Sequence, residues 1–175
     1  ERFKDTYLDA VSHVTRLIEA KEAKKVVIAR SLALKFSEEV SSPSAMYHVS
    51  KEQPESFVFG LELEDQLFFG ATPERLVKVE NQKALSTCLA GSIKRGQTAT
   101  EDQQLGNELI HDAKNREEHQ YVVDMITQVF AEYCKEVKVP KYPKLMKIRD
   151  IQHLYTPVEG VLEKGQGLLQ LVQDL

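Results

Sequence analysis

The segment FVFGLELEDQLFFG, residues 57–70, contains two apolar runs that are separated by Glu64-Asp65. Short runs of β-prone residues on either side of a polar two-residue turn are typical of a β-hairpin. A second pair of such runs, residues 76–79 and 84–89, surrounds another short polar turn. The centre of the chain is therefore predicted to form two antiparallel hairpins.

Helical and extended patterns lie on both sides of the hairpins. The helices predicted from the spacing of apolar residues and from helix-start signals are residues 1–23, a short helix after Ser41, one or two helices over 101–136, and a last helix from about Gly167. The further predicted strands are 26–36, 145–151 and the region around 154–155. Helices at both ends of a block of hairpins predict an α+β fold with a largely antiparallel sheet.

Composition limits the classes of function. The chain has 175 residues, 42% of them hydrophobic, and a net charge of −4, which fits one globular domain. Cys88 and Cys134 have no metal-ligand spacing and indicate a reducing, cytoplasmic compartment. The acidic balance gives no footprint for nucleic acid, and no apolar run reaches the roughly 20 residues of a membrane span. No nucleic-acid or membrane partner is therefore expected.

Lys25 is a candidate general base. It precedes the predicted strand and, by strand alternation, shares a face with Val27 and Ala29. Burial of that face would lower the pKa of the lysine, which is how a lysine becomes a base near neutral pH. The alternative, which the spacing by itself favours, is a solvated corner between helix and strand.

Glu74 is a candidate general acid. Thr72-Pro73-Glu74 follows an apolar strand and has the pattern of a helix start, with Thr72 as the N-cap and Pro73 in the first helical position. In one interpretation Glu74 complements the positive end of that helix. In the other, its carboxyl lies at the end of a strand and faces a ligand.

Two adjacent glutamates occupy different faces of the predicted long helix. Glu117 lies on a polar stripe, whereas Glu118 lies on an apolar one, where a carboxylate is unfavourable unless it is paired or binds a cation. Lys114, four residues earlier, could pair with Glu118. The alternative is Mg²⁺, which favours one or two carboxylates together with water and substrate oxygens. His119 adds little to the case for a metal.

Two further segments could meet a ligand. Leu89-Ala90-Gly91-Ser92 ends a strand in small residues, where the backbone can approach a ligand closely, although an ordinary turn is the default interpretation. His153 lies in an apolar extended stretch, where a core histidine with its hydrogen bonds satisfied is the ordinary alternative to a functional one.

Five segments occur in order along the chain: KVVIAR at 25–30, FGATPE at 69–74, LAGS at 89–92, NREEH at 115–119 and QHLYTPVEG at 152–160. In this order and spacing they resemble the chorismate-utilising enzyme family, and within it the isochorismate synthases. The resemblance implies chorismate as the small-molecule substrate. It also implies that residues 1–175 form part of the family's catalytic domain, an α/β sandwich like that of anthranilate synthase component I.

The resemblance further implies a role for each matching residue. Lys25 matches the lysine that activates the attacking water, Glu74 the general acid, and Glu118 a magnesium ligand. Water would add at ring carbon 2 of chorismate while the hydroxyl at carbon 4 leaves, in menaquinone or siderophore biosynthesis. Ala90 stands where aminodeoxychorismate synthases carry a lysine nucleophile, which argues against that branch.

The remaining matches concern the substrate pocket. Gly91 and Ser92 match the loop that approaches the substrate, and His153 and Thr156 match residues that border the ring pocket. Glu159 matches a recurrent family position without an assigned role.

The sequence also departs from the family pattern. The family domain continues with a segment that carries a further magnesium glutamate and carboxylate-binding residues, and this chain does not contain it. We therefore expect a fragment that is inactive by itself and that self-associates through exposed sheet edges. Two alternatives stay open, a salicylate synthase and a non-catalytic subunit of the chorismate family.

Overall fold

The computed structural model describes residues 2–175, which divide into two compact units, residues 1–40 and 41–175. The first unit contains α1, Arg2–Glu19, as the spacing predicted, followed by chain without regular structure. The predicted strand at 26–36 is wrong. A strand needs a neighbouring backbone to pair with, and the described part of this unit provides one helix and no second strand. Lys25 and most of the apolar side chains that follow it are exposed.

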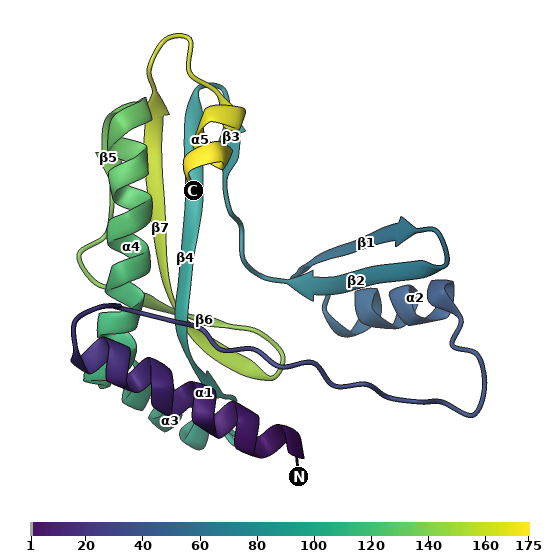
Figure 1. Cartoon of the computed structure of the whole chain (residues 1–175). Helices are drawn as coiled ribbons and strands as arrows, with labels where there is room; N and C mark the ends of the chain where they lie inside the picture. The colour runs from purple at the N-terminus through teal and green to yellow at the C-terminus, as the bar shows by residue number, and fades with distance from the viewer. Residues whose placement is uncertain (1) are drawn as a thin grey trace. The chain divides into compact units, whose positions relative to one another are not determined.

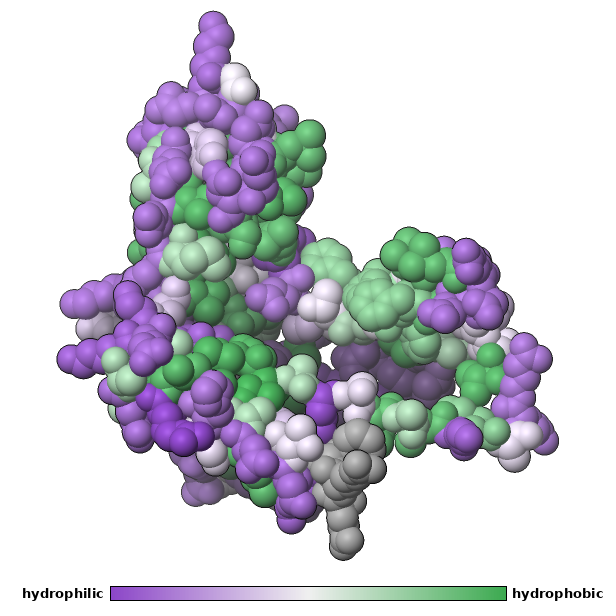
Figure 2. Space-filling view, viewed as in Figure 1, coloured by the Kyte–Doolittle hydropathy of each residue, from purple (hydrophilic) through white to green (hydrophobic). Residues whose placement is uncertain are grey.

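The second unit begins with a helix and the first predicted hairpin. Helix α2, Ser42–Glu52, starts at the N-cap Ser41 and is followed by β1, Phe57–Leu63, and β2, Gln66–Thr72. The two strands pair antiparallel around Glu64, which has a positive φ of 53°, so this hairpin is confirmed. Helix α2 packs on the hairpin, and several large apolar side chains of the hairpin remain exposed (Figure 2), among them Phe57, Phe59, Leu61, Leu63 and Phe68.

A five-stranded antiparallel sheet forms the centre of the second unit (Figure 1). Its strands are β3, Lys78–Glu80; β4, Lys83–Lys94; β5, Cys134–Lys138; β6, Lys144–Lys147; and β7, Ile151–Leu162. The order is β3-β4-β7-β5, and β6 also pairs with β7. The second hairpin and the strand around 154–155 are confirmed, whereas the predicted strand 145–151 is divided between β6 and the first residue of β7, with residues 148–150 outside both strands. Because the sheet is antiparallel and helices pack on it, the predicted α+β class is also confirmed.

Two helices occupy the region predicted as one long helix or two. Helix α3 is Ala99–His111 and α4 is Ala113–Tyr133. Asp112 separates them: its backbone N–H donates to the last turn of α3, and its carboxylate accepts the N–H of Asn115 at 2.7 Å. The predicted helix extends too far, because Cys134 already starts β5 and its side chain is buried in the core.

The core lies between the sheet and two helices on one of its faces, α4 and α5, Leu168–Asp174 (Figure 1). Phe130 of α4 and Leu171 of α5 are fully buried there, and the Tyr133 hydroxyl donates to Asp174. On β7 the even-numbered residues from 152 to 162 are buried and the odd-numbered residues are not. Each face of β7 therefore has its own environment. No helix within residues 2–175 is long and apolar enough to cross a membrane.

A buried carboxylate joins three elements at one end of the sheet. Asp102 of α3 is 7% exposed and accepts hydrogen bonds from Arg95 and Lys147, each at 2.7 Å. The fully buried Gln152 of β7 donates to the Asp102 backbone carbonyl at 3.0 Å. The Arg95 guanidinium and then the Lys147 ammonium hold the pKa of Asp102 well below its usual range.

Candidate functional site

The pairing of β4 with β7 is interrupted by a bulge. Leu89 pairs with Tyr155 and Ser92 with His153, so Ala90 and Gly91 together lie opposite a single residue of β7. Gly91 has a φ of +80°, and a Cβ atom there would lie 3.1 Å from the Cβ of Asn115 on α4. This close approach and the left-handed backbone explain why the bulge contains a glycine.

The bulge places two of the predicted pocket residues together on the face of the sheet away from α4. The Ser92 hydroxyl and Nδ1 of His153 are 2.8 Å apart, within hydrogen-bond distance. Ser92 is exposed and His153 is half-buried, and burial lowers the pKa of the imidazole. The structure thus brings Ser92 and His153 into a polar pair that solvent reaches, with Gly91 next to Ser92 in the chain.

Thr156 lies on the opposite face of β7, toward α4. Its hydroxyl is 2.8 Å from Nε2 of His119, and both side chains are buried, each 2% exposed. Nδ1 of the same imidazole is 3.1 Å from the carbonyl oxygen of Ala90. Burial holds the pKa of His119 below its usual value. Thr156 is therefore not on the face that carries Ser92 and His153.

The buried position of His119 was not predicted from the sequence. The signal that could have found it is its helical spacing with Val123, Ile126 and Phe130, all of which are buried against the sheet. A histidine on such a stripe must satisfy two ring nitrogens inside the core. Its partners, 29 and 37 residues away along the chain, could not be read from that spacing.

Glu118, the neighbour of His119, pairs with Lys114 at 2.9 Å, as one of the two interpretations predicted. The carboxylate raises the pKa of Lys114. The side chain of Glu118 is 35% exposed, so its stripe lies at the margin of the buried face of α4. Within the described residues, no three or more His, Cys, Asp or Glu side chains gather as a metal site would require, so Glu118 offers a single carboxylate.

Glu74 follows β2, but the helix predicted to start there is wrong. The Glu74 N–H donates to the Thr72 hydroxyl at 3.1 Å, a local turn that uses the same residues as an N-cap. The chain then extends beside β4, because the Arg75 N–H donates to Thr87 Oγ1 at 3.0 Å and the Arg75 carbonyl accepts the Thr87 N–H at 3.2 Å. A segment held by a neighbouring strand cannot coil into a helix.

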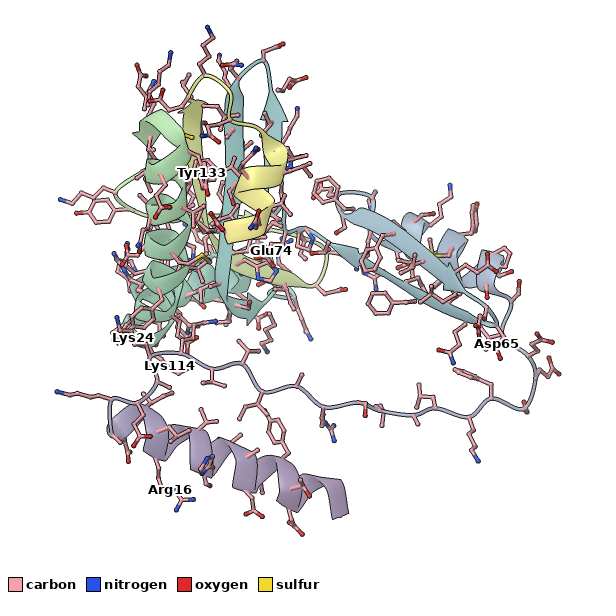
Figure 3. The ribbon with its side chains drawn as sticks, turned by 45° about the horizontal axis from the view of Figure 1, so that its top comes forward. Arg16, Lys24, Asp65, Glu74, Lys114 and Tyr133 are labelled. Carbon is pink, nitrogen blue, oxygen red and sulfur yellow. The ribbon has the colours of Figure 1, made fainter. Side chains whose placement is uncertain are left out.

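Glu74, labelled in Figure 3, lies between β2 and β3, and its carboxylate acts electrostatically on the buried thiol of Cys88 on β4. Burial raises the pKa of the Cys88 thiol to about 12, and the Glu74 carboxylate contributes to the rise. Glu74 itself is exposed. Lys25 is exposed and belongs to the first unit, residues 1–40. Glu159 is exposed on β7, opposite Leu85 of β4.

The family model described as chorismate binding enzyme matches residues 1–175. The chain belongs to this family. Isochorismate synthase MenF of Bacillus subtilis is 40% identical over 172 residues, which are 98% of this chain and 36% of that protein. The salicylate biosynthesis isochorismate synthase of Pseudomonas aeruginosa is 35% identical over 151 residues, 86% of this chain and 32% of that protein.

Among solved structures of the chorismate binding enzymes, the menaquinone-specific isochorismate synthase MenF of Escherichia coli matches with a TM-score of 0.70 and 25% identity. The match covers 78% of this chain and 32% of the solved one. Anthranilate synthase component I of Streptococcus pneumoniae, 24% identical, has the same fold with a TM-score of 0.65. The chain thus spans about a third of the length of the Bacillus subtilis and Pseudomonas aeruginosa relatives.

Proposed function

We propose that this chain is part of an isochorismate synthase that converts chorismate to isochorismate. The observation that carries the proposal is the 40% identity to an isochorismate synthase over nearly the whole chain. The geometry supports it, because Ser92 and His153 form an open polar pair beside a bulge.

In this proposal Lys25 and Glu74 perform the proton transfers. Lys25 takes a proton from water as the water oxygen bonds to ring carbon 2, the role that the resemblance gives it. The ring double bonds shift, and the bond from carbon 4 to its hydroxyl breaks as Glu74 donates a proton to the departing oxygen. Water enters and water leaves, so the reaction is an isomerisation, and in the reverse direction the two residues exchange roles.

Gly91, Ser92 and His153 would bind the substrate. The Ser92 hydroxyl and the His153 ring offer hydrogen bonds on the solvent-accessible face, next to the backbone of Gly91. We assign no direct substrate contact to Thr156, which is 2% exposed on the other face of β7.

Glu118 fits the role of a single magnesium ligand. Mg²⁺ commonly takes one or two protein carboxylates and completes its shell with water and substrate oxygens. The carboxylate is partly exposed, and its partner Lys114 is 77% exposed, so their ion pair is weak and can be released. When bound, the ion would supply positive charge to a substrate carboxylate.

Turnover of chorismate tests the proposal. The 175-residue chain, and a chimera in which it replaces the matching segment of Bacillus subtilis MenF, are incubated with chorismate and Mg²⁺, and the products are separated by chromatography. We expect isochorismate from the chimera, and loss of turnover in Lys25→Ala and Glu74→Gln versions that remain folded. A folded chimera without turnover would refute the proposal. Salicylate and pyruvate as products would identify a salicylate synthase instead.

A further inference from the structure

His119 connects the helix layer to both central strands of the sheet. It is 2% exposed, and its two ring nitrogens contact groups on two different strands, the carbonyl of Ala90 on β4 and the hydroxyl of Thr156 on β7. A buried ring with both nitrogens engaged has one orientation. The segments that it touches are therefore held at fixed positions relative to α4.

The chemistry of the two partners fixes the direction of both hydrogen bonds. A carbonyl oxygen accepts and cannot donate, so Nδ1 of His119 carries the proton that bonds to Ala90. In the neutral ring Nε2 is then the acceptor, and the Thr156 hydroxyl donates to it. A continuous series of hydrogen bonds therefore runs from the Thr156 hydroxyl through the His119 imidazole to the Ala90 carbonyl.

This series of hydrogen bonds ends at Ala90, in the bulge that determines which face of the sheet the Ser92 side chain occupies. Ala90 and Gly91 form the bulge, and Ser92 resumes the pairing opposite His153. Successive residues of a strand face opposite sides, so loss of the bulge would shift the register by one residue and turn Ser92 away from His153. The His119 hydrogen bond to Ala90 holds the bulge to α4, and the backbone of Gly91 lies so close to α4 that a Cβ there would be 3.1 Å from the Cβ of Asn115.

We infer that His119 is a positioning residue, which holds the bulge so that Ser92 faces the substrate side, and that Thr156 acts through His119. The part that concerns the substrate rests on the proposed function. The part that concerns the bulge rests on the hydrogen bonds described above.

A double-mutant cycle read by NMR tests the inference on the 175-residue chain. The backbone amide shifts of Gly91 and Ser92 are compared in wild type, His119→Phe, Thr156→Val and the double variant. We expect Thr156→Val to move both amides in the wild-type background and to have no further effect beside His119→Phe. Equal shifts in both backgrounds would overturn the inference, because Thr156 would then act independently of His119.

Three further measurements complete the test. Thr127→Val is the matched control, because this α4 hydroxyl is buried without a hydrogen-bond partner in the described part of the chain, so the Gly91 and Ser92 amides should not move. His119→Asn keeps a donor near Ala90, so we expect it to restore the wild-type shift of Gly91 more closely than His119→Phe does. The ring ¹⁵N spectrum of wild type, which needs no variant, should show the proton on Nδ1; a proton on Nε2 would overturn the inference.

Activity of the MenF chimera separates this inference from the proposed function. His119→Phe should lower kcat/KM by up to about 100-fold, because a displacement on the order of 1 Å in a binding group has such an effect. Thr156→Val should lower it in the wild-type background and not in the His119→Phe background. If the NMR cycle behaves as expected and the chimera makes no isochorismate, the bulge assignment stands and the proposed function fails.

Discussion

Replacement of Gly91 by alanine should destabilise the second unit by more than the cost of a left-handed backbone conformation alone. Gly91 has a φ of +80°, and a Cβ there would lie 3.1 Å from the Cβ of Asn115 and 3.2 Å from Cδ1 of Leu154. The left-handed backbone costs an L-residue about 1–2 kcal/mol. Forcing an atom into a packed site costs roughly 1–3 kcal/mol more. We therefore expect the free energy of unfolding to fall by about 2–5 kcal/mol.

Gly165 provides the matched control. Its φ is +89°, but a Cβ there would meet no heavy atom within 4 Å. Gly165→Ala should therefore show the backbone cost without the crowding, a loss of about 1–2 kcal/mol. The loss of chain entropy in the unfolded state is common to both variants and cancels in the comparison.

Urea unfolding followed by far-ultraviolet circular dichroism measures both losses. The midpoints should fall at an unchanged slope, since neither change alters the surface exposed on unfolding. Equal losses in Gly91→Ala and Gly165→Ala would refute the claim that α4 crowds the bulge. In the MenF chimera, Gly91→Ala should also lower turnover of chorismate, whereas the change at Gly165 should not.

Three further predictions concern single side chains. Asp102→Asn should lower the Tm at pH 7. Because the pKa of Asp102 is lowered in the folded state, its contribution to stability is complete above the unfolded pKa of about 4 and is lost as the pH falls below that value. The Tm values of the wild type and the variant should therefore converge in acid. A difference in Tm that does not change with pH would contradict this. Cys88 should react with a thiol reagent only at the rate of unfolding, because its side chain is fully buried and its pKa is raised to about 12. A Cys88→Ala variant serves as the control. Rapid labelling of Cys88 in the native chain would contradict the prediction. Thr127→Val should leave stability unchanged or raise it by about 1 kcal/mol in urea unfolding, because it removes a buried hydroxyl that has no partner in the structure described, and a clear loss would show that the hydroxyl is bonded.

The hairpins and the last helix were predictable because their signals are local. The Glu64-Asp65 turn lies between two β-prone runs, and the structure pairs those runs residue by residue. Gly167 is the N-cap of α5, as its position before an apolar segment indicated. In each case the residues that determine the element are a few positions apart in the sequence.

The errors arose where distant contacts decide the structure. The apolar run after Lys25 has the composition of a strand, but composition does not supply a pairing partner. Thr72-Pro73 fits a helix start equally well as a local turn, and Thr87 of β4 decided between them by bonding the backbone of Arg75.

The roles of the candidate site residues stay predictions, and the structure shows only which of these residues lie together. Gly91, Ser92 and His153 were found from the sequence, and the structure places them together. Thr156 and His153 are three residues apart on β7, so strand alternation by itself puts them on opposite faces, whereas which of the two faces meets α4 is decided by packing that no motif encodes.

The alternation along β7 has a consequence for how this strand tolerates change. At even-numbered positions from 152 to 162 a replacement must match the shape of a filled interior, whereas odd-numbered positions are half-buried or exposed and accept a wider range of side chains. Most single substitutions therefore affect one face of the strand and spare the other. Deletion of one residue from the strand is different, because it exchanges the two sets of side chains beyond that point. We therefore expect β7 to accept many replacements and almost no change in length.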